Sequence, residues 1–131
     1  MIARLETQRS WVRNHFTTNA SELYETFGGK MDLIENILKS KWVDKSETYK
    51  LQCLGVALGD SLIQDLGFRW IEIEDEFGVD PALKLSNTSL ILFPLTMISK
   101  RIENNQEIDI YALYNGIKDH VLKVKDKVDK K

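Results

Sequence analysis

The sequence predicts an α+β fold in which a helical N-terminal half precedes a small three-stranded antiparallel sheet and two C-terminal helices. The spacing of apolar residues along the chain supports this order. Apolar residues recur at helical spacing up to Leu66, alternate with polar residues over 71–74, and return to helical spacing after Pro94. The length of 131 residues predicts one domain, 1–131, whose core needs no metal or disulfide to fold.

Three helices are expected in the N-terminal half. The apolar positions predicted to face the core of the first are Ile2, Leu5, Val12 and Phe16. Gly28-Gly29 interrupts the pattern, and the second helix follows with Leu33, Ile34, Ile37, Leu38 and Trp42. The third runs from about Ser46, the expected N-cap, to Leu66, where Gly67 is a natural stop.

The pattern changes to that of a sheet after Gly67. Ile71 and Ile73 alternate with Glu72 and Glu74, which is typical of a strand with one solvated face. Residues 78–81 (GVDP) have turn composition. The aliphatic runs 82–85 and 88–93, joined across Ser86-Asn87, complete an antiparallel meander.

Two helices are expected to close the chain. Pro94 suits a first helical position, because its missing amide would be unpaired there anyway. Leu95, Ile98 and Ile102 form the buried face of that helix. The last helix has apolar residues at spacings typical of packing along another helix, either within the chain or in a homodimer: Ile110, Tyr114, Ile117, Val121, Val124 and Val128.

Composition excludes several classes of protein. The net charge of −2 argues against a dedicated nucleic-acid binder. Cys53 is the only cysteine, which favours a reducing compartment. The charged first 16 residues do not have the pattern of a signal peptide, and no apolar run predicts a membrane span. We expect a cytoplasmic protein without a cofactor, either monomeric or homodimeric.

The third helix contains two unusual features. Gly55 and Gly59 lie one turn apart, and the spacing predicts close approach by a neighbouring helix or the sheet; a phosphate-binding loop is the alternative, but its glycines belong in a strand-to-helix loop. Asp60 follows them and requires a partner if it is covered. Lys100 and Arg101 are the candidates by charge, and a structural ion pair is favoured over a catalytic acid.

The densest acidic run is a candidate partner-binding face. Glu72, Glu74 and Glu76 share one side of the expected strand, while Asp75 shares the other side with the isoleucines. Residues 75–80 lack the ligand spacing of a calcium loop, so we expect no metal there but a turn capped by Asp80, with Asp75 as an anchor.

Trp70 falls on the glutamate side of the same strand. A tryptophan covered by a helix would be core, and one left exposed beside the acids would be a binding hot spot. We favour the core position, because small antiparallel sheets are usually packed by helices on one face. No residues form a nucleophile motif, and Cys53 lies among apolar residues as an inert thiol.

The segment from Leu54 to Arg101 resembles a family of small bacterial proteins described only as a domain of unknown function. The motifs that carry the resemblance are LGxxLGD from Leu54, LGxxW from Leu66, DExGxDxAL from Asp75 and LFPLxMISKR from Leu92. The resemblance implies a shared fold and a bacterial source, and it supplies no catalytic residue. The polar positions within the motifs are Asp60, Asp75, Asp80, Lys100 and Arg101.

Two functions fit the sequence. The first is a non-enzymatic protein-binding module, either antitoxin-like or immunity-type or a subunit of an assembly, that uses its acidic face on another, basic protein. The second is a small-ligand or metal-binding enzyme using Asp60, Asp75, Asp80 and Lys100, which requires these side chains to converge on one concave site. We favour the first, because no acid–base pair or nucleophile is evident.

Overall fold

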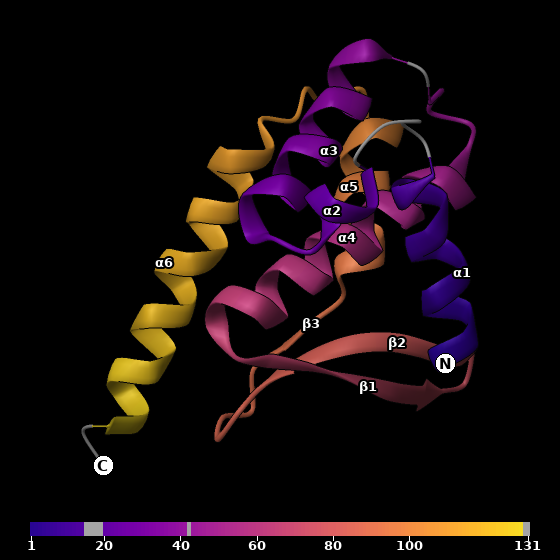
Figure 1. The fold of residues 1–131 in the computed structure, drawn as a ribbon. Coiled ribbons are helices and arrows are strands. Elements are labelled where there is room, and N and C mark those ends of the chain that lie inside the picture. The colour runs from indigo at the N-terminus through magenta and orange to yellow at the C-terminus, as the bar shows by residue number, and fades with distance from the viewer. Residues whose placement is uncertain (15–19, 42, 130–131) are drawn as a thin grey trace.

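The computed structural model describes residues 1–14, 20–41 and 43–129, and it confirms the α+β fold and the order of elements (Figure 1). Phe16, Trp42 and the side chain of Val128 lie outside the described residues. A short additional helix, α2, separates the first two predicted helices. The elements are α1 (Ile2–Arg13), α2 (Ala20–Tyr24), α3 (Phe27–Ser40), α4 (Thr48–Leu66), β1 (Phe68–Asp75), β2 (Gly78–Leu85), β3 (Ile91–Leu92), α5 (Pro94–Glu103) and α6 (Ile110–Asp129).

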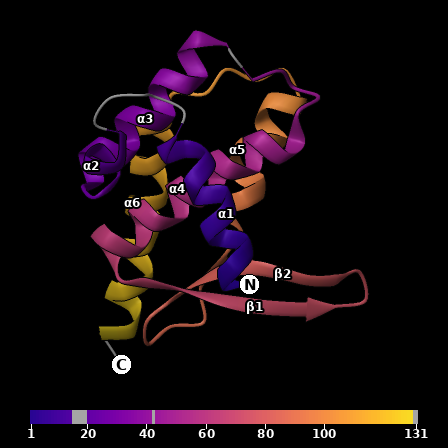
Figure 2. The ribbon, with the colours of Figure 1, turned by 45° about the vertical axis from the view of Figure 1, so that its right-hand side comes forward.

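Helix α4 lies at the centre of the helical layer and contacts α1, α3, α5 and β1 (Figure 2). Its apolar residues are buried on nearly every side and include Leu54, Leu58 and Leu62. The helix begins at Thr48 with Glu47 as N-cap, slightly later than expected, and ends at Gly67, which adopts the left-handed conformation (φ +83°) that favours glycine.

Close approach to α4 explains its two glycines. A β-carbon on Gly55 would lie 2.5 Å from the Leu95 Cα atom and 2.5 Å from the Pro94 carbonyl oxygen, so α5 packs directly on the α4 backbone. A β-carbon on Gly59 would lie 2.5 Å from the Trp70 ring. The predicted close contact is confirmed, and it comes from both a helix and the sheet.

The sheet has the order β1-β2-β3, with antiparallel neighbours. A two-residue turn, Glu76-Phe77, joins β1 to β2, so the predicted turn at 78–81 is wrong: these residues belong to β2. Pro81 is tolerated in this strand because β3 reaches only Leu83 and Lys84, which leaves β2 without a second neighbour at the proline.

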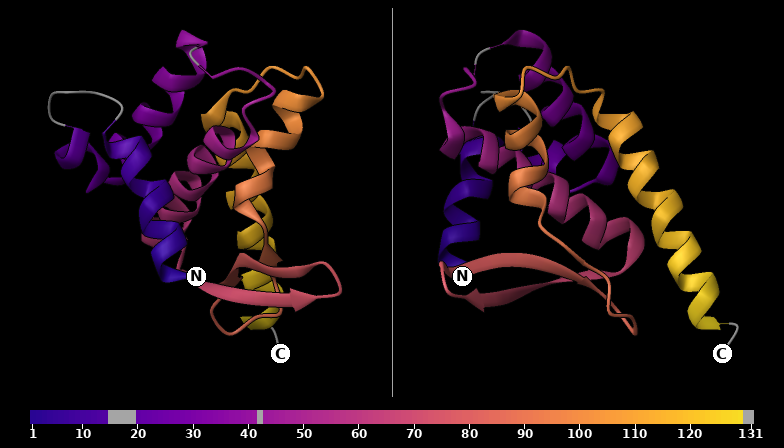
Figure 3. Two further views of the ribbon diagram at one scale, coloured as in Figure 1. Left: turned by 90° about the vertical axis from the view of Figure 1, so that its right-hand side faces the viewer. Right: turned by 180° about the vertical axis from the view of Figure 1, so that it is seen from behind.

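The two faces of the sheet differ from the prediction for β1. Phe68 and Trp70, opposite Leu85 and Leu83, face the helices, and Trp70 packs against the core as expected. Ile71 and Ile73 lie on the other face and are only half-buried. The glutamate side of the strand is therefore the helix-facing side, and it becomes solvated only where the hairpin extends past the helices (Figure 3).

The C-terminal helices pack as predicted. Pro94 occupies the first turn of α5, and Leu95 and Ile98 are buried. Helix α6 buries Ile110, Tyr114 and Val121 and lies along α3 within the same chain, where the rings of Phe27 and Tyr114 have centroids 4.8 Å apart. Within the described residues, no helix is both long and apolar enough to cross a membrane.

Replacing Gly55 with alanine is expected to destabilise the protein, because backbone atoms of α5 occupy the space of the new methyl group. We expect a net loss of about 1–3 kcal/mol in the free energy of unfolding by urea titration, despite the better helix propensity of alanine. Gly116→Ala in α6 is the matched control, since its new methyl meets no atom within 4 Å. It should stabilise by about 0.5–1 kcal/mol, and a similar gain for Gly55→Ala would contradict the close packing.

Candidate functional site

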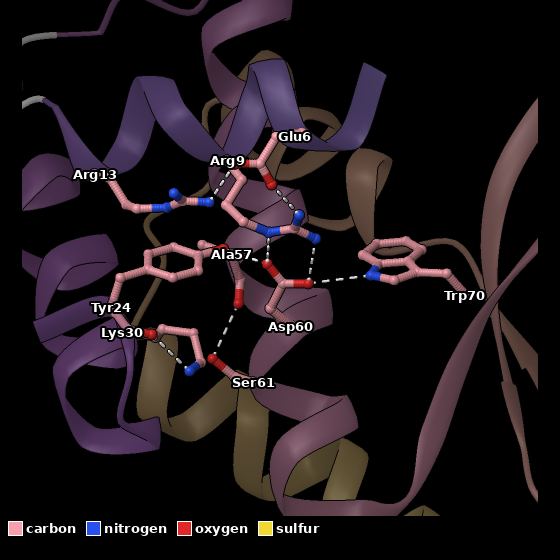
Figure 4. A network of polar contacts seen from close by, with 9 residues as sticks. All are labelled: Glu6, Arg9, Arg13, Tyr24, Lys30, Ala57, Asp60, Ser61 and Trp70. Carbon is pink, nitrogen blue, oxygen red and sulfur yellow. Dashed lines mark hydrogen bonds and ion pairs between the residues drawn. The ribbon is translucent and has the colours of Figure 1, made fainter. Parts of the chain in front are cut away.

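Asp60 is the centre of a polar network between α1, α2, α4 and β1 (Figure 4). The carboxylate accepts two hydrogen bonds from Arg9, from Nε at 2.6 Å and from Nη2 at 2.9 Å. It also accepts the Trp70 indole N–H at 3.0 Å and the Tyr24 hydroxyl. The Asp60 side chain is only 14% exposed, so these four donors replace the water that a carboxylate would otherwise bind.

Further charged side chains lie around this centre. Glu6 accepts hydrogen bonds of 2.7 Å from both Arg9 and Arg13. The Arg13 guanidinium lies 5.4 Å from the centroid of the Tyr24 ring, and the Lys30 ammonium lies 5.3 Å from it. Lys30 is buried and donates a 2.8 Å hydrogen bond to the Tyr24 carbonyl oxygen. The network therefore holds α2 as well as α1 (Figure 4).

The protonation states of this network favour a fixed structure. Hydrogen bonding to Asp60 raises the pKa of Arg9, which stays charged. Burial, together with the Asp60 charge, raises the pKa of Tyr24 far above its ordinary value, so the hydroxyl keeps its proton and remains a donor. Burial lowers the pKa of Lys30. Each Asp60 oxygen accepts two hydrogen bonds, and the network joins α1, α2, α4 and β1.

The predicted partners of Asp60 were wrong. Lys100 is exposed, and Arg101 donates to the Met97 carbonyl oxygen within its own helix. Arg9 takes the place predicted for them, because α1 crosses α4 on the side of Asp60. Arg9 is not among the apolar positions of the first helix, and no local signal in the sequence pairs it with a residue 51 positions away.

The remaining predicted polar residues do not form one cluster with Asp60. Asp75 lies at the hairpin, where it accepts a 2.8 Å hydrogen bond from the Phe77 amide and so takes the capping role predicted for Asp80. Asp80 and Lys100 line a small pocket of about 240 Å³ together with Arg4 and Gln52. The structure thus brings Asp80 and Lys100 to one place and leaves Asp60 and Asp75 elsewhere.

A larger pocket, of about 740 Å³, lies at the other end of the molecule from the hairpin, between the end of α3, the end of α5 and the start of α6 (Figure 1). Its apolar floor includes Ile37, Leu51 and Ile108. Charged residues of both signs also line it, including Glu35, Lys41 and Asp44. In the described part of the chain, no three His, Cys, Asp or Glu side chains are grouped as a metal would require.

The acidic residues predicted as a partner-binding face lie on the β1–β2 hairpin. Glu72 and Glu74 share one side of β1 and are exposed, whereas Glu76 lies in the turn rather than on that side. Phe77, which the sequence analysis missed, is 88% exposed at the tip, and Val79 is 50% exposed. The signal that could have found Phe77 is an aromatic residue before glycine within an acidic run. We call the exposed residues Glu72, Glu74, Asp75, Glu76, Phe77, Val79 and Asp80 the hairpin surface.

Comparison with known proteins identifies the family. The profile described as "Domain of unknown function (DUF3806)" matches residues 30–114, which is more than half of the chain. The chain therefore belongs to this family, as the motifs between Leu54 and Arg101 indicated. The match spans α3 to the start of α6 and includes Asp60 and the whole hairpin, but not α1, which supplies Arg9. No curated protein and no solved structure gives a significant match.

Substituting Asp60 with asparagine, which has a side chain of nearly the same volume, is expected to destabilise the fold. The change removes the negative charge and turns one acceptor oxygen into a donor facing Arg9 or Trp70. We expect a loss of about 2–4 kcal/mol in the free energy of unfolding, measured by urea titration. Glu35→Gln, which breaks a surface ion pair with Lys39, should leave the unfolding midpoint nearly unchanged. An equally small effect at Asp60 would contradict its anchoring role.

The Cys53 thiol is expected to be unreactive in the folded protein. It is fully buried, and burial raises its pKa to about 11. A disulfide reagent at about pH 8 should label the folded protein at least about a hundredfold more slowly than protein unfolded in urea. The pKa of the Cys53 thiol is higher in the folded protein than in the unfolded chain. The neutral thiol therefore contributes to stability below the pKa of the unfolded chain, and this contribution is lost as the pH rises towards 11. Equal labelling rates would show an accessible nucleophile.

Proposed function

We propose that this member of the family is a non-enzymatic protein-binding module of the bacterial cytoplasm that uses its hairpin surface to bind a basic partner protein. An antitoxin-like or immunity-type protein, which masks its partner, has this chemistry, and so does a subunit of a larger assembly. The observation that carries the proposal is Phe77, an aromatic side chain 88% exposed at the tip of an acidic hairpin.

An exposed Phe77 ring is unfavourable in water, and a binding partner that covered the ring would remove this cost. Burying an aromatic ring of this size removes a large apolar area from water, and aromatic residues are enriched in interface cores. Val79 adds a second exposed apolar side chain near the tip. The carboxylates around them would form the polar rim, attract a cationic partner and repel an anionic one.

The hairpin is held in place for such a role. Eight consecutive residue pairs join β1 to β2, and Asp75 caps the turn by its hydrogen bond to Phe77. The end of the hairpin nearest the helices is fixed by Trp70. Its indole N–H donates to Asp60, and its ring packs directly over Gly59. A preorganised element loses little conformational freedom on binding, which favours affinity.

The enzymatic alternative gains no support from the arrangement of its residues. It needs Asp60, Asp75, Asp80 and Lys100 at one concave site, and only Asp80 and Lys100 line the same pocket. Asp60 is enclosed by four donors. We therefore propose the binding module alone.

Neutralising the hairpin should weaken binding to a cationic probe. We would use an eight-residue peptide of alternating lysine and valine and measure its affinity by isothermal titration calorimetry at about 50 and about 200 mM salt. The variant with Glu72→Gln, Glu74→Gln and Glu76→Gln should lose about tenfold in affinity at low salt and most of the salt dependence. Phe77→Ala should weaken binding at both salt concentrations, because its contribution is apolar.

The matched control carries the same change in charge elsewhere. Glu22→Gln, Glu107→Gln and Asp119→Asn remove three exposed carboxylates outside the hairpin. This variant should bind the peptide as the wild type does. If both triple variants lose affinity equally, the interaction reflects net charge and not the hairpin surface. If the wild type does not bind at all, the proposal fails.

A further inference from the structure

Strand β1 forms an open edge of the sheet. It has eight residues, and among the strands that the structure describes its one neighbour is β2. In the views of Figures 1, 2 and 3 no other described strand runs along its outer edge, and the N-terminus lies close to the strand at Glu72. An edge strand of this length presents a row of unpaired N–H and C=O groups, and such a row is a template on which another chain can pair.

The register of the hairpin determines which backbone groups point outward. Asp75 and Gly78 close the two-residue turn as a hydrogen-bonded pair, and in an antiparallel ladder such pairs alternate with non-hydrogen-bonded ones. Pro81, which has no N–H, then falls opposite Glu72 in a non-hydrogen-bonded pair, as the alternation requires. Beyond Phe68, which is buried, the outward-pointing backbone groups of β1 are those of Trp70, Glu72 and Glu74. In the described part of the chain, no backbone–backbone hydrogen bond outside the helices and strands reaches these three residues.

The side chains along this edge have two different characters. Glu72 and Glu74 lie on the helix-facing side of β1, and both are exposed. The N-terminal ammonium of Met1 lies 3.5 Å from the Glu72 carboxylate, so this position already accepts a cation. Ile71 and Ile73 lie on the opposite side of the strand and are half-buried. A strand added along the edge would place alternate side chains beside the glutamates and beside the isoleucines, because successive residues of a strand point to opposite faces.

We propose that β1 binds an extended segment of the partner protein by strand addition, and that this segment alternates basic and aliphatic residues. The proposal rests on the proposed function and specifies its partner and its mode of binding. Basic residues would pair with Glu72 and Glu74, and aliphatic residues would pack on Ile71 and Ile73. A second copy of this chain is disfavoured at the edge, because its own glutamates would oppose Glu72 and Glu74.

Two modified peptides test the mode of binding on the full-length chain. In one, every lysine of the alternating lysine–valine peptide is N-methylated on the backbone; in the other, every valine is. Since N–H groups of alternate residues point to opposite edges of a strand, strand addition predicts that one peptide loses about tenfold or more in affinity while the other keeps it within about threefold. If the peptide pairs antiparallel to β1, the peptide methylated at lysine should lose affinity. If it pairs parallel to β1, the peptide methylated at valine should lose affinity. Equal affinities for both modified peptides would overturn strand addition.

Amide hydrogen exchange provides a second readout on the protein. Binding of the unmodified peptide should slow exchange at Trp70, Glu72 and Glu74, whose amides face outward, and leave Ile71 and Ile73 unchanged, since their amides already face β2. No added protection at the three outward amides would overturn strand addition.

The failure of this inference differs from failure of the proposed function. In one outcome, the unmodified peptide binds in a salt-dependent way, the Glu72, Glu74 and Glu76 variant loses this binding, and the two methylated peptides have equal affinities. This outcome would support a charge-based docking surface and overturn strand addition. Absence of binding by the unmodified peptide would overturn both.

Discussion

The acceptance of four hydrogen bonds by Asp60 is the interaction on which the rest of the structure depends. It joins α1 through Arg9, α2 through Tyr24 and β1 through Trp70 to the central helix α4. A carboxylate with so little exposure is stable only because each of its donors is held in position. Losing one donor would leave an Asp60 acceptor without its partner. The hydrogen bonds from Arg9, Tyr24 and Trp70 therefore support one another and hold the three elements against α4.

Small residues on α4 make this arrangement possible. Gly59 lies directly before Asp60 and provides the space in which the Trp70 ring sits, so the indole N–H can reach the carboxylate. One turn earlier, Gly55 lets the start of α5 approach the helix backbone. The two glycines lower the intrinsic helix propensity of α4, and the packing of α5 and the sheet offsets that cost. The LGxxLGD motif thus describes a packing surface followed by its electrostatic anchor.

The sheet has an anchored end and a projecting end. Near the helices its packed face carries Phe68, Trp70, Leu83 and Leu85, which belong to the core or pack against it. Farther along the strand the same face carries Glu72 and Glu74, which are exposed, and the side chain of Phe77 in the turn is 88% exposed. A rigid ladder that changes from core to acidic surface along its length can hold a recognition element away from the body of the protein, which is the basis of the proposed function.

The sequence by itself determined the class of fold, the order of elements, the start of α5 at Pro94, the end of α4 at Gly67 and the reason for Gly55 and Gly59. These follow from local rules of periodicity and backbone geometry. It also indicated the family. Only the tertiary structure decided which cation meets Asp60, which face of β1 is covered and where the hairpin turns. Pairing between Arg9 and Asp60 depends on how α1 crosses α4, and charge alone favoured Lys100 and Arg101 equally well. The covered face depends on which side of the strand the helices occupy, because alternation is the same for either choice. The turn falls at Glu76-Phe77 because the strand register, and not the composition of 78–81, places Gly78 opposite Asp75.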